Sequence, residues 1–499
     1  MGALSTLLSH KPAPAADGQL QLTVVDEETK RPVACRMHLV GKNRKPRKVE
    51  TAPFWHDHFV FPGKITLKLP LGDYQFEIRR GLEYHSQQGH FVIERFADDT
   101  KQLELRRAVD MSAEGWWSGD LYVRRPQRDI ELLMSADDLH LAQVVTWSND
   151  KNEWGNKPRP KSEPVLYDRN RWYYGLAGLY SRAGTDLLCF FQPEPLPLTQ
   201  SPGEYPPTIQ TILAAKEKGK LWVDVAAPYS WDLPMLVAHD LVDSIQVAHS
   251  HFCRQNVVAD EAGGKPRDLN AYSHVSGYAR WIQDIYFRLL DCGVRIPPSA
   301  GSGSGVAANP VGYNRVYVHL EGSLQPEAWW KHFRGGQVVV TNGPLLRPRV
   351  EGHLPGYVFR TDEGEELELE IGLTLSTCDP ISYLEVIQDG RVAYTLRFED
   401  YAKTGRLPKV KCTKSGWFLL RAVNDLNNTY RFAMTAPWYV EFGGKRRISK
   451  QAAQFFLDWV YERARQIKID DAGQRREVLQ YHRKARDYWQ ALVGKANAE

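Results

Sequence analysis

Apolar and polar residues alternate with a period of two through residues 17–109, in short runs such as QLQLTVVD and KITLKLPLGDYQFEIRR. Gly, Pro and Asp separate these runs. Such alternation places every second side chain on one face of a strand, which can then pack on a core. The pattern predicts an antiparallel β-sandwich over residues 17–110, of the immunoglobulin-like or carboxypeptidase-regulatory-like kind, after a tail at residues 1–16.

The pattern changes from residue 111. Apolar runs such as LAQVVTW, LWVDVA and SIQVAH are followed by stretches with helical spacing, among them TIQTILAAKEKG and GYARWIQDIYFRLLDCG. Alternating strands and helices predict a parallel sheet or barrel over residues 111–345. Sites in such folds lie at the carboxyl ends of the strands.

The period of two returns over residues 346–445, in runs such as ELELEIGLTL and GWFLLRAVND, and predicts a second β-sandwich. Residues 446–499 contain two amphipathic stretches with helical spacing, and Ser449 is placed to cap the first. The whole pattern predicts a multidomain fold that combines α/β with all-β parts and ends in a helical pair.

Polar and aromatic side chains gather where the strands predicted for residues 111–345 end. Aromatic rings beside polar groups are typical of sugar pockets, although most tryptophans pack in cores. The glycine-rich run SAGSGSGVAANP predicts a tight loop with Asn314 near the rim of the pocket. The residues proposed for this pocket are Asp120, Tyr122, Arg124, Trp147, Asn149, Asp224, His249, His251, Asn314 and Asn342.

Charge and composition narrow the range of partners. The net charge is +4, from 64 basic and 60 acidic side chains, so nothing in the total requires nucleic acid. No apolar run reaches the roughly eighteen residues needed to span a membrane. The N-terminal segment fits either a cytoplasmic protein or an exported one whose signal peptide is missing from this chain. Six scattered cysteines form no C-x-x-C pair, which argues against a thiolate zinc site.

The chain resembles the CehA/McbA family of metallohydrolases, relatives of the PHP superfamily, in EGWWSGDLYVRRPQRDIELLMSADDLHLAQVVTWSND, IPPSAGSGSGVAANPVGYNRVYVHL and VVVTNGPLLRPRVEG. The resemblance implies a PHP-like, distorted βα barrel of the TIM type, flanked by two β-sandwich modules. It also implies a site that binds divalent metal and cleaves phosphate or other ester-like bonds.

The family motif Asp-x-His-x-His falls on Asp120, Tyr122 and Arg124, so only its aspartate is present. A family carboxylate is expected where Leu179 stands, and GSGSG replaces a later Asp-x-His. His251 matches a family histidine. With both imidazoles replaced, one by a permanent cation, the usual two-metal centre is not expected.

Two alternatives stay open for the metal and for Arg124. Asp120, Asp224 and His251 could together hold zinc, manganese or iron, or the site could bind no metal. The Arg124 guanidinium could fork onto a phosphate, sulfate or carboxylate, or it could be a solvated residue of the RRPQR turn.

Two functions follow. In the first, the protein is a hydrolase of phosphoester, ester or glycan substrates, with Asp120, Asp224 and His251 as catalytic residues. The other pocket residues then bind the substrate. In the second, the protein is a non-catalytic relative, a ligand-binding or scaffold module. In both cases the expected partner is a small molecule or glycan, most simply an anionic one.

Overall fold

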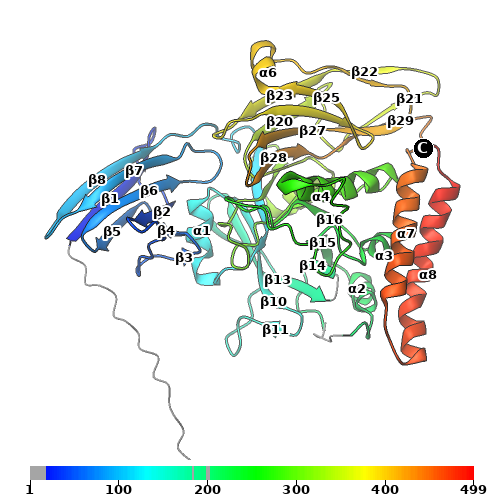
Figure 1. Ribbon diagram of the computed structural model, residues 1–499, viewed down its shortest axis with the longest axis horizontal. Coiled ribbons are helices and arrows are strands. Elements are labelled where there is room, and N and C mark those ends of the chain that lie inside the picture. The colour runs from blue at the N-terminus through cyan, green and yellow to red at the C-terminus, as the bar shows by residue number, and fades with distance from the viewer. Residues whose placement is uncertain (1–17, 183–184, 198–202) are drawn as a thin grey trace, which may run out of the picture. The chain divides into compact units, whose positions relative to one another are not determined.

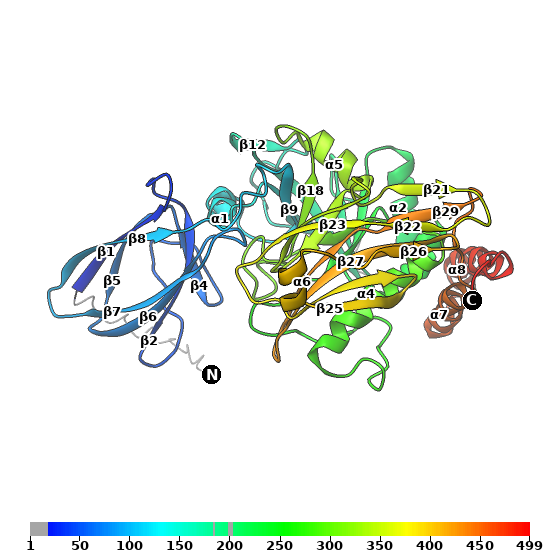
Figure 2. The same ribbon diagram turned by 90° about the horizontal axis from the view of Figure 1, so that it is seen from above.

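The computed structural model describes residues 18–182, 185–197 and 203–499, so the tail predicted at 1–16 lies outside the described residues. The chain divides into two compact units. The first contains residues up to 80 and residues 84–107, and the second contains 81–83 and 108–499. The protein is multidomain and rich in β-structure (Figures 1 and 2).

The first unit is a β-sandwich, as the period of two predicts. One sheet has the order β5–β1–β8 and the other has the order β3–β4–β2–β6–β7. Between the sheets lies a core that includes Val24, Met37, Leu39, Phe59 and Ile78, all fully buried. The strands are β1 (Gly18–Asp26), β2 (Cys35–Gly41), β3 (Phe54–Trp55), β4 (His58–Phe61), β5 (Lys64–Leu69), β6 (Gly72–Arg79), β7 (Gln87–Ile93) and β8 (Asp98–Leu105).

The second unit begins with strands that position the predicted pocket. Among the described residues, seventeen strands from β9 to β29 are linked through hydrogen-bonded pairs, and the set closes on itself. The first strands are β9 (Trp116–Val123), β10 (Leu141–Ser148), β11 (Lys151–Asn152), β12 (Val165–Asp168), β13 (Arg171–Arg182), β14 (Thr185–Phe190), β15 (Trp222–Val225), β16 (Ser244–Ala248), β17 (Pro298–Ala300), β18 (Arg315–His319) and β19 (Val338–Thr341).

Six of the later strands of the second unit (β21, β24, β25, β27, β28 and β29) belong to the same linked set as the first strands, whereas β20 pairs with β23 and β22 pairs with β26 in two separate two-stranded sheets. β28 pairs with β19, so the segment after residue 345 continues the hydrogen bonding of the segment before it. The strands are β20 (Leu345–Val350), β21 (Val358–Thr361), β22 (Leu367–Leu369), β23 (Ile371–Ser376), β24 (Tyr383–Gln388), β25 (Arg391–Arg397), β26 (Val410–Cys412), β27 (Gly416–Asp425), β28 (Tyr430–Thr435) and β29 (Trp438–Phe442).

The predicted fold class, an α/β and all-β combination built on a PHP-like βα barrel, is wrong. The described residues form twenty-nine strands and only eight α-helices. β13, β14 and β15 follow one another as antiparallel neighbours, and β18 runs antiparallel to β9, whereas a βα barrel requires parallel strands. Runs such as LAQVVTW are buried on both faces, and a central strand looks the same in sequence whichever way its neighbours run.

The helices cover parts of the second unit. α7 and α8 form a long pair, drawn orange and red in Figure 1. The Ser449 side chain accepts a hydrogen bond from the amide of Ala452, which confirms the predicted cap. No helix in the described part of the chain has both the length and the apolar character to span a membrane. The helices are η1 (Gln127–Asp129), α1 (Ile130–Ala136), α2 (Thr208–Glu217), α3 (Leu233–Ala238), α4 (His274–Asp291), α5 (Pro326–Arg334), α6 (Phe398–Thr404), α7 (Lys450–Gln466) and α8 (Ala472–Gly494).

Candidate functional site

Asp120 lies on β9, fully buried, and its carboxylate accepts three backbone hydrogen bonds. Oδ1 accepts from the amides of Tyr122 and Ser302, both at 3.0 Å, and Oδ2 accepts from the amide of Gly312 at 2.7 Å. Burial raises the pKa of Asp120 to about 6, although these hydrogen bonds oppose the rise. The carboxylate therefore ties residues 302–312 to β9, and both of its oxygens are used by protein donors.

Asp224 is held in the same manner on β15. Oδ1 accepts from the hydroxyls of Ser244 and Ser299, at 2.6 and 2.5 Å, and Oδ2 accepts from the amide group of Gln246 at 2.9 Å. Burial raises its pKa, and these bonds again act in the opposite direction. The donors lie on β16 and β17, so Asp224 joins three neighbouring parallel strands. This arrangement is that of a buried carboxylate whose hydrogen bonds are satisfied.

His249 and His251 follow β16 and pack against each other with ring centroids 4.5 Å apart. Nδ1 of His249 accepts from the amide of His251 at 3.1 Å. Nδ1 of His251 lies 2.9 Å from the hydroxyl of Tyr278 on α4. Burial lowers the pKa of both imidazoles, so both are neutral near pH 7. Tyr229 completes this aromatic cluster, 5.9 Å from the His249 ring.

Tyr122 lies on β9 and Arg124 directly follows that strand. Tyr122 is 8% exposed, and burial raises the pKa of its hydroxyl to about 12. Nε of Arg124 lies 3.1 Å from Oε1 of Glu153, with the two side chains 33% and 41% exposed. The guanidinium is thus partly exposed and paired with an acidic side chain rather than isolated in a pocket.

Trp147 and Asn149 sit at the end of β10. Trp147 is buried against Gly178 of β13, where an added Cβ would lie only 1.9 Å from the indole ring. The Asn149 side chain donates to the carbonyl of Ser181 at 2.9 Å and accepts from its amide at 3.1 Å. Both residues therefore contact the neighbouring strand β13.

Asn314 and Asn342 also use their side chains on the backbone. Nδ2 of Asn314 donates to the carbonyls of His249 at 3.0 Å and Phe252 at 3.2 Å. Asn342 accepts from the amide of Phe432 at 2.9 Å and donates to the carbonyl of Tyr430 at 3.0 Å. The structure therefore joins Asn314 to the His249 turn, whereas Asn342 is engaged with β28.

Gly301 packs closely between Tyr122, a residue of the predicted site, and Gln246. A Cβ at this position would lie 2.5 Å from Cβ of Tyr122 and 2.7 Å from Nε2 of Gln246, the donor to Asp224. Only glycine fits there, so the glycine-rich run passes between β9 and β16. Both predicted carboxylates contact this run, Asp120 through the amide of Ser302 and Asp224 through the hydroxyl of Ser299.

An open groove of about 770 Å³ lies elsewhere in the second unit. The Arg334 guanidinium stacks 4.6 Å from the centre of the Trp222 ring, and Lys216 pairs with Asp243 at 2.7 Å. The Trp330 and Phe191 rings meet edge to face, 4.9 Å apart. Aromatic walls and cations thus adjoin one another in this groove. Its lining includes Tyr174, Phe191, Lys216, Lys220, Trp222, Asp243, Trp330, Lys331 and Arg334.

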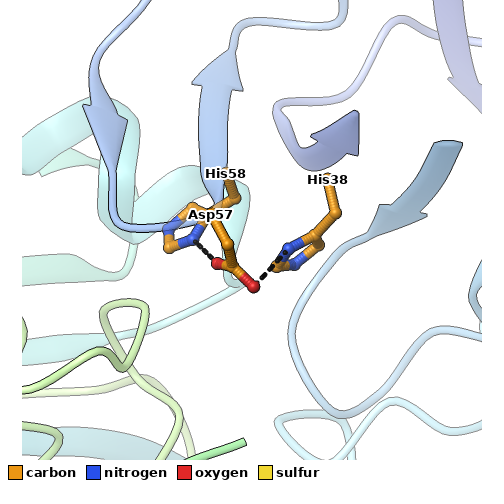
Figure 3. Close-up of side chains that lie close together, drawn as sticks. All are labelled: His38, Asp57 and His58. Carbon is orange, nitrogen blue, oxygen red and sulfur yellow. Dashed lines mark hydrogen bonds and ion pairs between the residues drawn. The ribbon is translucent and has the colours of Figure 1, made fainter. Parts of the chain in front are cut away.

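The first unit contains a cluster of metal-ligating side chains, shown in Figure 3. Nδ1 of His38 lies 3.2 Å from Oδ2 of Asp57, and Nδ1 of His58 lies 2.9 Å from Oδ1. Burial raises the pKa of Asp57, but hydrogen bonds from both imidazoles outweigh burial and hold it well below its usual range. Burial lowers the pKa of His58 to about 3.

Among the described residues, His38, Asp57 and His58 are the group whose ligand atoms lie close enough together to share one metal ion. The predicted set of Asp120, Asp224 and His251 does not form such a group there. Sequence reasoning missed the three residues of the first unit, although the segment FWHDHFVF carries a visible signal. It also missed Gln246 and Tyr278, for which periodicity offers no signal because both are buried polar positions within regular elements.

Comparison with known proteins gives little similarity. No family model and no curated protein matches the chain. The crystal structure of GBS52, the minor pilin of Streptococcus agalactiae, matches 19% of this chain and 47% of that chain, with 23% identity and a TM-score of 0.16. The Bacillus anthracis TIE protein matches 22% of this chain and 20% of that chain, with 19% identity and a TM-score of 0.15. The chain thus spans less than half the length of either protein.

Proposed function

We propose that the second unit is a non-catalytic ligand-binding module. The observation that carries this proposal is the state of the two carboxylates. The carboxylate oxygens of Asp120 and Asp224 accept hydrogen bonds from protein donors at distances of 2.5 to 3.0 Å. Protein donors thus take three of the about four acceptor sites of each carboxylate, and among the described residues the two carboxylates do not come together with His251 to share a metal ion.

The ligand that we propose is an anionic small molecule or sugar derivative. The groove beside Trp222 supports this choice, because cations line it together with aromatic side chains. Arg334 is 65% exposed and stacks on Trp222, and its guanidinium lies 3.7 Å from the Asp243 carboxylate. A phosphate, sulfate or carboxylate would bind this guanidinium in competition with Asp243. Arg124, with its partial exposure, is the second place where an anion could bind, in competition with Glu153.

Thermal melting of the full chain with sugar phosphates and sulfated sugars tests the proposal. A ligand that binds the folded state raises the melting temperature. Loss of that rise in Arg334→Ala would place the ligand in the groove, and loss in Arg124→Ala would place it beside Glu153. Arg128→Ala is the matched control, since Arg128 is 86% exposed and does not line the groove.

Hydrolysis assays with chromogenic phosphoesters and esters, with and without added zinc, manganese or iron, test the alternative function. We expect no turnover above background. Metal-dependent turnover that disappears in Asp120→Asn, while the variant retains its fold by circular dichroism, would replace the proposal with the hydrolase.

A further inference from the structure

The pairing of β2 with β4 brings His38 and His58 together. Arg36 lies opposite Val60 and Met37 lies opposite Phe59, and the next pair in this antiparallel register is His38 and His58. Residues directly opposite in an antiparallel pair project to the same face. Their ring centroids are 5.2 Å apart.

The turn between β3 and β4 supplies the third group. His56 has a φ of 49°, in the left-handed region, and this tight reversal directs Asp57 between the two imidazoles. Figure 3 shows the Asp57 carboxylate pointing to both rings, with one oxygen facing each. The side chains of His38, Asp57 and His58 are 9%, 15% and 1% exposed, so the cluster opens to solvent mainly at the carboxylate.

The spacing of the three ligand atoms suits a single metal ion. Ligand atoms about 2.1 Å from a tetrahedral zinc ion lie roughly 3.4 Å apart. The two nitrogen-to-oxygen distances here are 3.2 and 2.9 Å, and all three atoms lie within 4.8 Å of one another. An ion could therefore enter with small movements of the side chains.

A further imidazole, that of His56, lies beside the cluster. Nδ1 of His56 lies 4.0 Å from Oδ1 of Asp57, and its side chain is 57% exposed. It can therefore swing over the solvent side of the cluster without disturbing the core. Arg36 is buried on β2, two residues before His38. Its positive charge disfavours the binding of a metal cation to the cluster. Asp57 offsets that charge, and the nitrogen-rich donor set favours a metal that imidazole binds well.

We propose that His38, Asp57 and His58 bind one divalent transition-metal ion, zinc first among them, and that His56 closes the site. Imidazole suits zinc, copper, iron and nickel, whereas calcium and magnesium prefer oxygen ligands. The ion would link the β3–β4 turn to β2 through its ligands and so stabilise the sandwich. This site is independent of the function proposed for the second unit.

The test uses the full chain without a polyhistidine tag, stripped with chelator and then titrated with zinc. We expect one zinc ion per chain to survive gel filtration, and calorimetry to show at least tenfold weaker binding in Asp57→Asn and His38→Gln. His56→Ala should weaken binding less. His90→Ala is the matched control, because His90 is exposed on β7 of the same unit.

Cobalt provides a spectroscopic check, since a tetrahedral site gives intense visible bands that an adventitious surface site lacks. If Asp57→Asn does not fold in chelator, the zinc affinities of His38→Gln and His56→Ala are compared with that of the wild type instead. The proposal is overturned if the wild-type chain retains no zinc, or if the variants bind it as tightly as the wild type.

Discussion

Asp120 in the second unit and Asp57 in the first unit are two enclosed carboxylates with different partners. Asp120 meets three backbone amides, whereas Asp57 meets two imidazoles. A backbone N–H does not release its proton near neutral pH, so Asp120 serves to hold a loop. An imidazole can exchange its proton for a metal ion, so the Asp57 cluster retains chemistry that the predicted site lacks.

The two carboxylates also differ in the balance between burial and hydrogen bonding. Burial dominates at Asp120 and raises its pKa to about 6, whereas the imidazole partners dominate at Asp57 and keep its pKa low. The partners of a carboxylate, rather than its place in the sequence, therefore decide what it can do.

Removal of the Asp120 carboxylate should have the largest effect. Asp120→Ala leaves the buried amides of Tyr122, Ser302 and Gly312 without their acceptor. Each buried donor left unsatisfied costs about 1–3 kcal/mol, so we expect the free energy of unfolding to fall by about 3 kcal/mol or more. Denaturant melts followed by tryptophan fluorescence measure this, since most tryptophans lie in the second unit.

Asp120→Asn is the control for that experiment, because its amide oxygen can still accept from one side of the loop. It should lose clearly less stability than Asp120→Ala. Equal stability of Asp120→Ala and the wild type would mean that the three hydrogen bonds do not hold the loop.

The second largest effect should be the change in the unfolding free energy of the metal-free first unit with pH. The pKa of His58 is about 3 in the folded chain and near 6.5 in a free imidazole. Below pH 6.5 the unfolded state therefore binds the extra proton, and stability falls as pH decreases towards 3, by about 1.4 kcal/mol per pH unit. Nuclear magnetic resonance of the His58 ring in chelator should show no protonation down to pH 5.

His58→Gln separates this effect from the other histidines. The difference in unfolding free energy between the wild type and His58→Gln should shrink between pH 7 and pH 5. A difference that is constant over this range would show that His58 is not the group that titrates.

The pair of Arg124 and Glu153 should have the smallest effect. Exposed ion pairs contribute about 0–1 kcal/mol, and this pair is at least one third exposed on both sides. A double-mutant cycle with Arg124→Ala and Glu153→Gln should give a coupling energy in that range. A coupling of several kcal/mol would instead indicate that the guanidinium belongs to a buried site.

Local features of the fold were predictable, whereas its topology was not. The period of two predicted the first sandwich, and the Ser449 cap was predicted from residue type and position. The barrel prediction failed at β13 to β15, because strand direction depends on hydrogen-bonded neighbours and not on the composition of each strand. Most of the predicted site residues proved to be buried, whereas Arg124 and His251 are partly exposed. The hydrogen-bond partners of the buried ones lie mainly on other strands and loops.

The sequence by itself determined which segments alternate as strands, where the last helices begin, and that Tyr122 and Arg124 follow Asp120 at alternate positions. Only the tertiary structure decided what each polar side chain meets. Asp120 finds its partners 182 and 192 residues away, and His38 meets His58 through strand pairing. Periodicity reports which face of a strand is buried, but the partner of a buried polar group is chosen by the packing of distant segments.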